Sequence, residues 1–106
     1  MRVIIVKTTC SNSDEARKII LHLLNKRLIS SANFFPINSI SSWAGKVQEV
    51  DETLIFLKTR SKYWKKVKEE IKLIHSYKVP CILKINVCSN KEYESWINKQ
   101  TEQIKK

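Results

Sequence analysis

The chain has 106 residues, of which 42% are hydrophobic, and it carries a formal net charge of +10. This length fits one domain over residues 1–106, with enough core to fold without disulfides or a structural metal. Glycine occurs once, at Gly45, which excludes the glycine-rich phosphate loops of Walker-type NTPases and dinucleotide-binding domains. No apolar run approaches the ~20 residues of a membrane-spanning helix, so we expect no membrane partner.

The cysteines indicate a reducing compartment. Cys10, Cys81 and Cys88 are an odd number and form no CxxC pair, which disfavours a disulfide framework and a classical zinc site. Met1 and Arg2 lead directly into the apolar residues 3–6 without the longer apolar segment of a secretory signal. We therefore expect a cytoplasmic protein.

The first third of the chain predicts a strand followed by a helix. Residues 3–9 begin with four consecutive β-branched residues and are typical of a buried strand. Asn12 with Glu15 three positions later forms a capping-box pattern, which predicts a helix start. The helix has its apolar residues at helical spacing, namely Ala16, Ile19, Ile20, Leu23 and Leu24. We expect it to end near the cations Lys26 and Arg27, which suit the negative end of the helix dipole.

The middle of the chain predicts a long hairpin. Residues 30–43 are extended, with Pro36 favouring an edge or a bend, and Ala44 with Gly45 forms the turn before a return strand over residues 46–57. Both arms are much longer than the ~5–6 residues of an ordinary strand. An overhanging hairpin has unpaired backbone groups that a neighbouring chain can satisfy, so the hairpin predicts an oligomer.

The last third predicts a helix, a strand and a terminal helix. Ser61 is a candidate cap for the first helix, whose apolar stripe is Trp64, Val67, Ile71 and Ile74. Pro80 separates it from a strand in which Cys81, Leu83, Ile85 and Val87 alternate with Ile82, Lys84 and Asn86. Ser89 and Glu92 form a second capping-box pattern before a helix with Tyr93, Trp96, Ile97 and Ile104 on one side. The order predicts an α+β, ferredoxin-like β-α-β-β-α-β fold with an extra C-terminal helix and an extended central hairpin.

Three short blocks stand in a fixed order between Pro36 and Pro80: residues 39–46 (SISSWAGK), 57–61 (LKTRS) and 75–80 (HSYKVP). Together with Asn33 and Trp96, this order resembles the CutA family of divalent-cation tolerance proteins. The resemblance implies a ferredoxin-like homotrimer with interlocked hairpins. It also implies a binding or regulatory role in the response to divalent cations such as copper, rather than catalysis.

The resemblance and the residue chemistry together give two candidate sites. The metal ligands of some relatives are a cysteine, a histidine and a glutamate, and here the equivalent positions read Lys7, His75 and Cys81. Imidazole and thiolate are soft ligands that suit Cu(I) or Zn(II), with further ligands from another copy. In the competing interpretation Cys81 is a small core residue and His75 caps the helix C-terminus. By resemblance alone, a polar pocket between copies would hold Lys46, Lys58, Thr59 and Tyr77.

The remaining candidates are weighed against ordinary structural roles. Pro36, Trp43 and Trp96 are expected to pack in the trimer interface or the core. Cys10 precedes a helix N-terminus, so it is either a reactive thiol or an incidental loop cysteine. His22 is expected to be solvated.

The basic residues of the second helix leave two interpretations open. Lys62, Lys65, Lys66, Lys68, Lys72 and Lys78 make either a phosphate-contacting face or the solvated side of an amphipathic helix. A nucleic-acid-binding ferredoxin-like module is therefore the alternative function, although the aromatic RNA-recognition motif is absent. The sequence has no acid–base or nucleophile–base pair, so we expect no enzyme.

Overall fold

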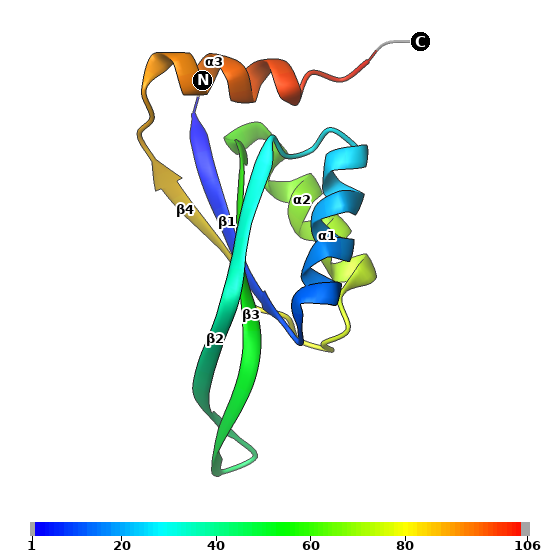
Figure 1. The fold of residues 1–106 in the computed structure, drawn as a ribbon, viewed down its shortest axis with the longest axis vertical. Coiled ribbons are helices and arrows are strands. Elements are labelled where there is room, and N and C mark those ends of the chain that lie inside the picture. The colour runs from blue at the N-terminus through cyan, green and yellow to red at the C-terminus, as the bar shows by residue number, and fades with distance from the viewer. Residues whose placement is uncertain (1, 105–106) are drawn as a thin grey trace.

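The computed structural model describes residues 2–104, which form an antiparallel four-stranded sheet in the order β2-β3-β1-β4. Helices α1 and α2 lie on one face of the sheet, and α3 crosses its end (Figure 1). The elements are β1 (Val3–Cys10), α1 (Ser13–Asn25), β2 (Ser31–Trp43), β3 (Lys46–Arg60), α2 (Trp64–Ile74), β4 (Ile82–Val87) and α3 (Lys91–Gln100). The predicted β-α-β-β-α-β order with a terminal helix is confirmed.

The core lies between the sheet and the two helices. Its fully buried side chains alternate along the central strands and recur at helical spacing, and they include Ile4, Val6, Ile19, Leu23, Ile55, Leu57, Val67 and Ile71. Each large aliphatic side chain buried in this way stabilises the fold by ~1.5–3 kcal/mol. The predicted apolar stripe of α2 is confirmed, with Trp64 and Ile74 packed against its edge.

Only the first predicted helix cap forms. Asn12 accepts a hydrogen bond from the Glu15 backbone N–H at 2.9 Å and so caps α1. The prediction for Ser61 is wrong: its N–H donates to the Arg2 carbonyl at 2.9 Å, and it opens a short 3-10 turn, Ser61–Tyr63. The prediction for Ser89 is also wrong. Its hydroxyl donates to the Asn90 carbonyl, and the N-cap position of α3 is Asn90, one residue later than predicted.

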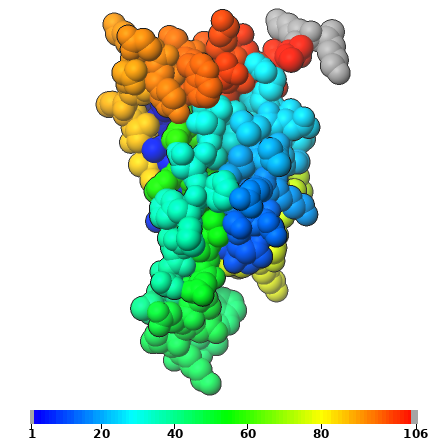
Figure 2. All heavy atoms as spheres, viewed as in Figure 1, coloured from blue at the N-terminus to red at the C-terminus, as the bar shows by residue number. Residues whose placement is uncertain are grey.

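The central hairpin extends well beyond the sheet. Strand β1 pairs with β3 only from Thr53 to Arg60, whereas β2 and β3 continue pairing to Trp43 and Lys46. Every residue from 40 to 51 is exposed, and this half of the hairpin projects as a separate lobe (Figure 2). Ala44 and Gly45 have φ of 50° and 78°, as the two central residues of a type I′ turn require.

The sheet face opposite the helices is apolar and uncovered. Ile85 pairs with Ile5 across β4 and β1, and directly opposed residues share a face. Phe35, Val50, Leu83 and Ile85 are 43%, 43%, 49% and 38% exposed. The apolar alternation predicted for β4 therefore places its larger side chains on this open face rather than in the core. Among residues 2–104, no helix combines the length and apolarity needed to cross a membrane.

Candidate functional site

The turn after α2 holds His75, the predicted metal ligand, in a buried network. Its imidazole is fully buried, Nε2 lies 2.8 Å from the Thr9 carbonyl, and Nδ1 lies 3.0 Å from the Tyr77 backbone N–H. A carbonyl only accepts and an N–H only donates, so Nε2 donates to Thr9 and Nδ1 accepts from Tyr77. Both nitrogens are engaged within the chain, and neither has a lone pair available for a metal ion in this conformation.

Tyr77 lies beside this imidazole, with ring centroids 4.9 Å apart. Its hydroxyl donates to the Glu52 carboxylate at 2.7 Å, which connects the turn to β3 where the hairpin leaves the sheet. Burial and the adjacent Glu52 carboxylate raise the pKa of Tyr77, because both disfavour the phenolate. Tyr77 therefore acts as a neutral hydrogen-bond donor that fixes the turn.

Glu15 binds this turn to the start of α1. Its carboxylate accepts hydrogen bonds from the backbone N–H and the hydroxyl of both Ser11 and Ser76, at 2.7–2.9 Å. Burial alone would raise the pKa of Glu15, but the hydrogen bonds from Ser11 and Ser76 outweigh it and lower the pKa to about 2. The sequence predicted a cap at Glu15, but it gave no sign of the partner 61 positions away.

The cysteines do not join the imidazole in a ready metal site. Cys81 is exposed, whereas Cys10 is buried at the end of β1. Burial, reinforced by the Glu15 carboxylate, raises the pKa of Cys10 to about 11, so the reactive-thiol interpretation is wrong. Within residues 2–104, no three His, Cys, Asp or Glu side chains are grouped closely enough to hold a metal ion.

The predicted polar pocket does not assemble within one chain. The Thr59 hydroxyl is fully buried and donates to the Leu28 carbonyl at 2.6 Å, so it braces the core instead of lining a pocket. The Lys58 ammonium donates to the Asn33 side-chain carbonyl on the open sheet face. Lys46 lies at the hairpin tip, ~40 Å along β3 from Lys58 at ~3.3 Å per residue. A pocket containing both lysines therefore needs more than one chain.

Arg60, next to these residues, fixes the C-terminal helix. Its Nε donates to the Thr101 hydroxyl at 2.9 Å, and its two terminal nitrogens donate to the Asn98 side chain and the Thr101 carbonyl. The guanidinium also lies 5.0 Å from the ring centroid of Tyr63. Arg60 is thus a planar clamp at the end of α3.

The predicted interface residues are exposed in the single chain. Trp43 at the hairpin tip is 65% exposed, and Pro36 is exposed where β2 leaves the sheet. Trp96 is 42% exposed and stacks on Tyr93 with ring centroids 5.6 Å apart. Pro36 and Trp43 lie on β2 and Trp96 lies on α3, and their place in an interface stays a prediction.

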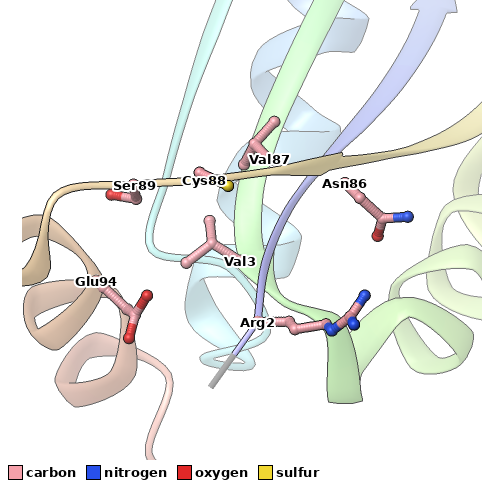
Figure 3. Close-up of a pocket in the computed structure, with 7 residues that line it drawn as sticks. All are labelled: Arg2, Val3, Asn86, Val87, Cys88, Ser89 and Glu94. Carbon is pink, nitrogen blue, oxygen red and sulfur yellow. The ribbon is translucent and has the colours of Figure 1, made fainter.

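The structure contains a cavity that the sequence did not predict. It has a volume of about 490 Å³, lies where β1 begins and β4 ends, and is lined by Arg2, Val3, Asn86, Val87, Cys88, Ser89 and Glu94. Figure 3 shows two of these side chains, Glu94 on α3 and Arg2 just before β1, among the residues that line it. A second cavity, of about 410 Å³, separates the start of α1 from the hairpin base and includes Pro36 and Glu52. Neither cavity contains His75 or Cys81.

His22 also differs from its prediction, since it is not simply solvated. Its Nε2 lies 2.8 Å from the carboxylate of Glu70, whose side chain is only 6% exposed, and Lys26 and Lys66 flank the same carboxylate at 3.2 and 3.8 Å. The hydrogen bond with His22, followed by the lysines, lowers the pKa of Glu70. This cluster joins α1 to α2, and a contact across 48 positions has no signal in the sequence.

The described chain is thus an α+β protein of the ferredoxin-like class, with an uncovered apolar sheet face and an overlong hairpin. The profile of the CutA1 divalent ion tolerance protein family matches residues 4–100. The Divalent-cation tolerance protein CutA of Pyrococcus horikoshii is 39% identical over 100 residues, covering 93% of this chain and 98% of the relative.

Solved structures agree with the family profile. The periplasmic divalent cation tolerance protein CutA of Archaeoglobus fulgidus superposes with a TM-score of 0.93 at 36% identity, covering 94% of this chain and 99% of that one. The divalent cation tolerance protein of Thermus thermophilus superposes with a TM-score of 0.90 at 33% identity, covering 94% and 99%. The chain belongs to the CutA1 family of divalent ion tolerance proteins.

Proposed function

We propose that this protein is a homotrimer that acts in the cytoplasm in divalent-cation tolerance, with copper as its cation, by binding or regulation rather than catalysis. The protruding hairpin carries the proposal. Half of it pairs with nothing but itself, and it exposes Ile40, Trp43 and Val47 at 68%, 65% and 78%. An isolated two-stranded ribbon is marginally stable in water, so other copies of the chain are the natural partners of this lobe.

The open sheet face supports the same assembly. Phe35, Leu83 and Ile85 are partly exposed on a face that no described helix covers. Large apolar side chains exposed on one sheet face support the use of that face as a protein interface. Two edge strands, β2 and β4, also offer unpaired backbone groups to a neighbouring chain.

The way the polar groups are used supports a role in binding or regulation. The imidazole of His75, the hydroxyl of Tyr77 and the hydroxyl of Thr59 all bond within the chain. Held in this way, the three groups position backbone, and a positioning role supports the proposal of binding or regulation. The alternative function, a nucleic-acid-binding module, finds no support in the comparisons or in residues 2–104.

Copper binding at His75 and Cys81 stays a prediction, and it requires a change in the hydrogen bonds of His75. His75 would have to exchange its bond with Thr9 or Tyr77 for the metal ion. Cys81 is exposed at the start of β4 and is free to contribute a thiolate. Further ligands would come from another copy, because a tight site needs more than two.

The test combines assembly and binding. Light scattering during gel filtration should give the mass of a trimer at micromolar concentration, and a folded monomer would overturn the assembly. Calorimetric titration with copper and with Zn(II) under reducing conditions should give binding that Cys81→Ala removes. Cys88→Ala is the matched control, because Cys88 is also exposed but lies at the other end of β4. Equal affinity in both variants would overturn the copper site without affecting the trimer.

A further inference from the structure

The outer surface of the two packed helices is strongly basic. Helices α1 and α2 lie side by side on the same face of the sheet (Figure 1), joined by the bond between His22 and Glu70. We call their outer surface the basic helical face. It carries Lys18 and Leu21 on α1, Lys65, Lys66, Lys72 and Leu73 on α2 and Lys62 in the turn just before α2, together with the exposed carboxylate of Glu69. This surface lies opposite the open sheet face, so it stays accessible when copies associate through the sheet.

Little of the positive charge on this face is neutralised. Within the part of the chain that the structure describes, Lys18, Lys65 and Lys72 form no ion pair. The buried Glu70 carboxylate already serves His22 and two lysines. The basic helical face is therefore a cationic surface that would attract a negatively charged partner.

Two large aliphatic side chains lie among these cations. Leu21 is 63% exposed on α1, and Leu73 is 76% exposed on α2. They lie at similar levels along the two antiparallel helices, since His22 faces Glu70. Neither leucine contributes to the core, and solvation of a lysine-rich face does not account for two exposed leucine side chains.

The combination of lysines and leucines on this face favours an anionic lipid surface over a nucleic acid as the partner. A nucleic acid would favour exposed aromatic rings for base stacking, but Trp64 is half-buried and has the Lys68 ammonium 5.2 Å from its ring centroid. Lysines with interspersed leucines are the composition that suits the boundary between lipid headgroups and acyl chains. Such a contact needs no spanning segment. The proposal therefore departs from the expectation of no membrane partner, which rested on the lack of a spanning run alone.

We propose that the basic helical face docks on an anionic phospholipid bilayer, with its lysines at the headgroup phosphates and Leu21 and Leu73 in the interfacial layer. Lysines near an anionic membrane each strengthen binding several-fold, and this attraction falls within a Debye length of ~8–10 Å. Binding should therefore require anionic lipid and weaken as salt rises. The leucines add a contribution that does not depend on salt.

The test measures co-sedimentation of the full chain with phosphatidylcholine vesicles, with and without phosphatidylglycerol. Wild-type protein should bind only the anionic vesicles, and Lys65→Glu with Lys72→Glu should weaken binding at least about tenfold. The matched control is Lys91→Glu with Lys99→Glu, which makes the same charge change on α3. Equal loss in the control would show that net charge, rather than this face, governs binding, and would overturn the proposal.

A second experiment tests the contribution of the two leucines. Leu21→Ser with Leu73→Ser should weaken vesicle binding about tenfold at every salt concentration, since both side chains are exposed and the core is untouched. Unchanged vesicle binding in this variant, with equally strong binding of single-stranded DNA by wild type, would identify a general polyanion surface and overturn the lipid assignment. Absence of wild-type binding to anionic vesicles at low salt would overturn the proposal outright.

Discussion

Replacing Glu15 by glutamine tests whether one carboxylate holds the turn after α2 to the start of α1. The substitution keeps the shape of the side chain but removes its charge, and its amide group presents a donor where Ser11 and Ser76 also donate. Hydrogen bonds to a charged group stabilise by ~1.5–3 kcal/mol each when buried. These bonds lie near the surface, and solvent screening reduces their combined contribution to ~2 kcal/mol.

The effect of this substitution should depend on pH with a defined sign. The pKa of Glu15 falls from its ordinary value of 4.5 to about 2 in the folded protein. A depressed carboxyl pKa stabilises the fold above the unfolded value and loses that effect as pH falls toward the folded one. The difference between wild type and Glu15→Gln should be full at pH 7 and should shrink steadily between pH 4.5 and pH 2.

Urea unfolding at fixed protein concentration measures this difference at each pH, since association would otherwise alter the apparent stability. The matched control is Glu69→Gln, an exposed carboxylate on α2 that forms no ion pair within residues 2–104. Surface changes of this kind usually stay within ~0.5 kcal/mol. A Glu15→Gln loss that is equally large at pH 2 and pH 7, or no larger than the control, would refute the reasoning.

Three further predictions concern polar groups with defined partners. Thr59→Val should cost ~1–3 kcal/mol in urea unfolding, because it leaves the Leu28 carbonyl without its donor. Thr8→Val should be neutral or stabilising, because the buried Thr8 hydroxyl has no partner among residues 2–104. The reverse order would contradict the hydrogen-bond assignment. Arg60→Lys should lower the free energy of unfolding by ~1–3 kcal/mol and increase proteolysis after residue 90, because one ammonium cannot replace the planar guanidinium. Unchanged resistance to protease would argue against a role of Arg60 in fixing α3. Cys10 should resist alkylation at pH 8 in folded protein and react on unfolding, so prompt labelling of native protein would count against its burial.

The sequence predicted the elements wherever the signal was local. Four consecutive β-branched residues define β1, and Asn12 with Glu15 sets the start of α1. Ser61 was predicted as a cap from its residue type, and Ser89 from a capping-box pattern with Glu92, but neither cap formed. Ser61 is held by a backbone bond to Arg2, an element 59 positions away, and a long-range bond of this kind overrides a local preference.

The candidate sites were less predictable because their partners are distant in the sequence. His22 was predicted to be solvated, but it contacts Glu70. Thr59 was predicted in a pocket, but its hydroxyl donates to the Leu28 carbonyl. The cavity beside Arg2 has no sequence signal, since it arises only where the ends of β1 and β4 meet α3. Residue type predicts what a side chain can do, but its partners determine what it does.

The residues that carried the family resemblance turn out to bond mostly within the chain. Thr59 braces a loop, Arg60 clamps α3, and His75 with Tyr77 fixes the turn before β4. A signature of this type specifies an architecture. It therefore identifies the family well and still leaves no ready ligand site within residues 2–104 of one chain. If the protein binds a cation, the ligands must come from exposed positions such as Cys81 or from surfaces shared between copies, and metal binding should be lost when the proposed trimer is dissociated.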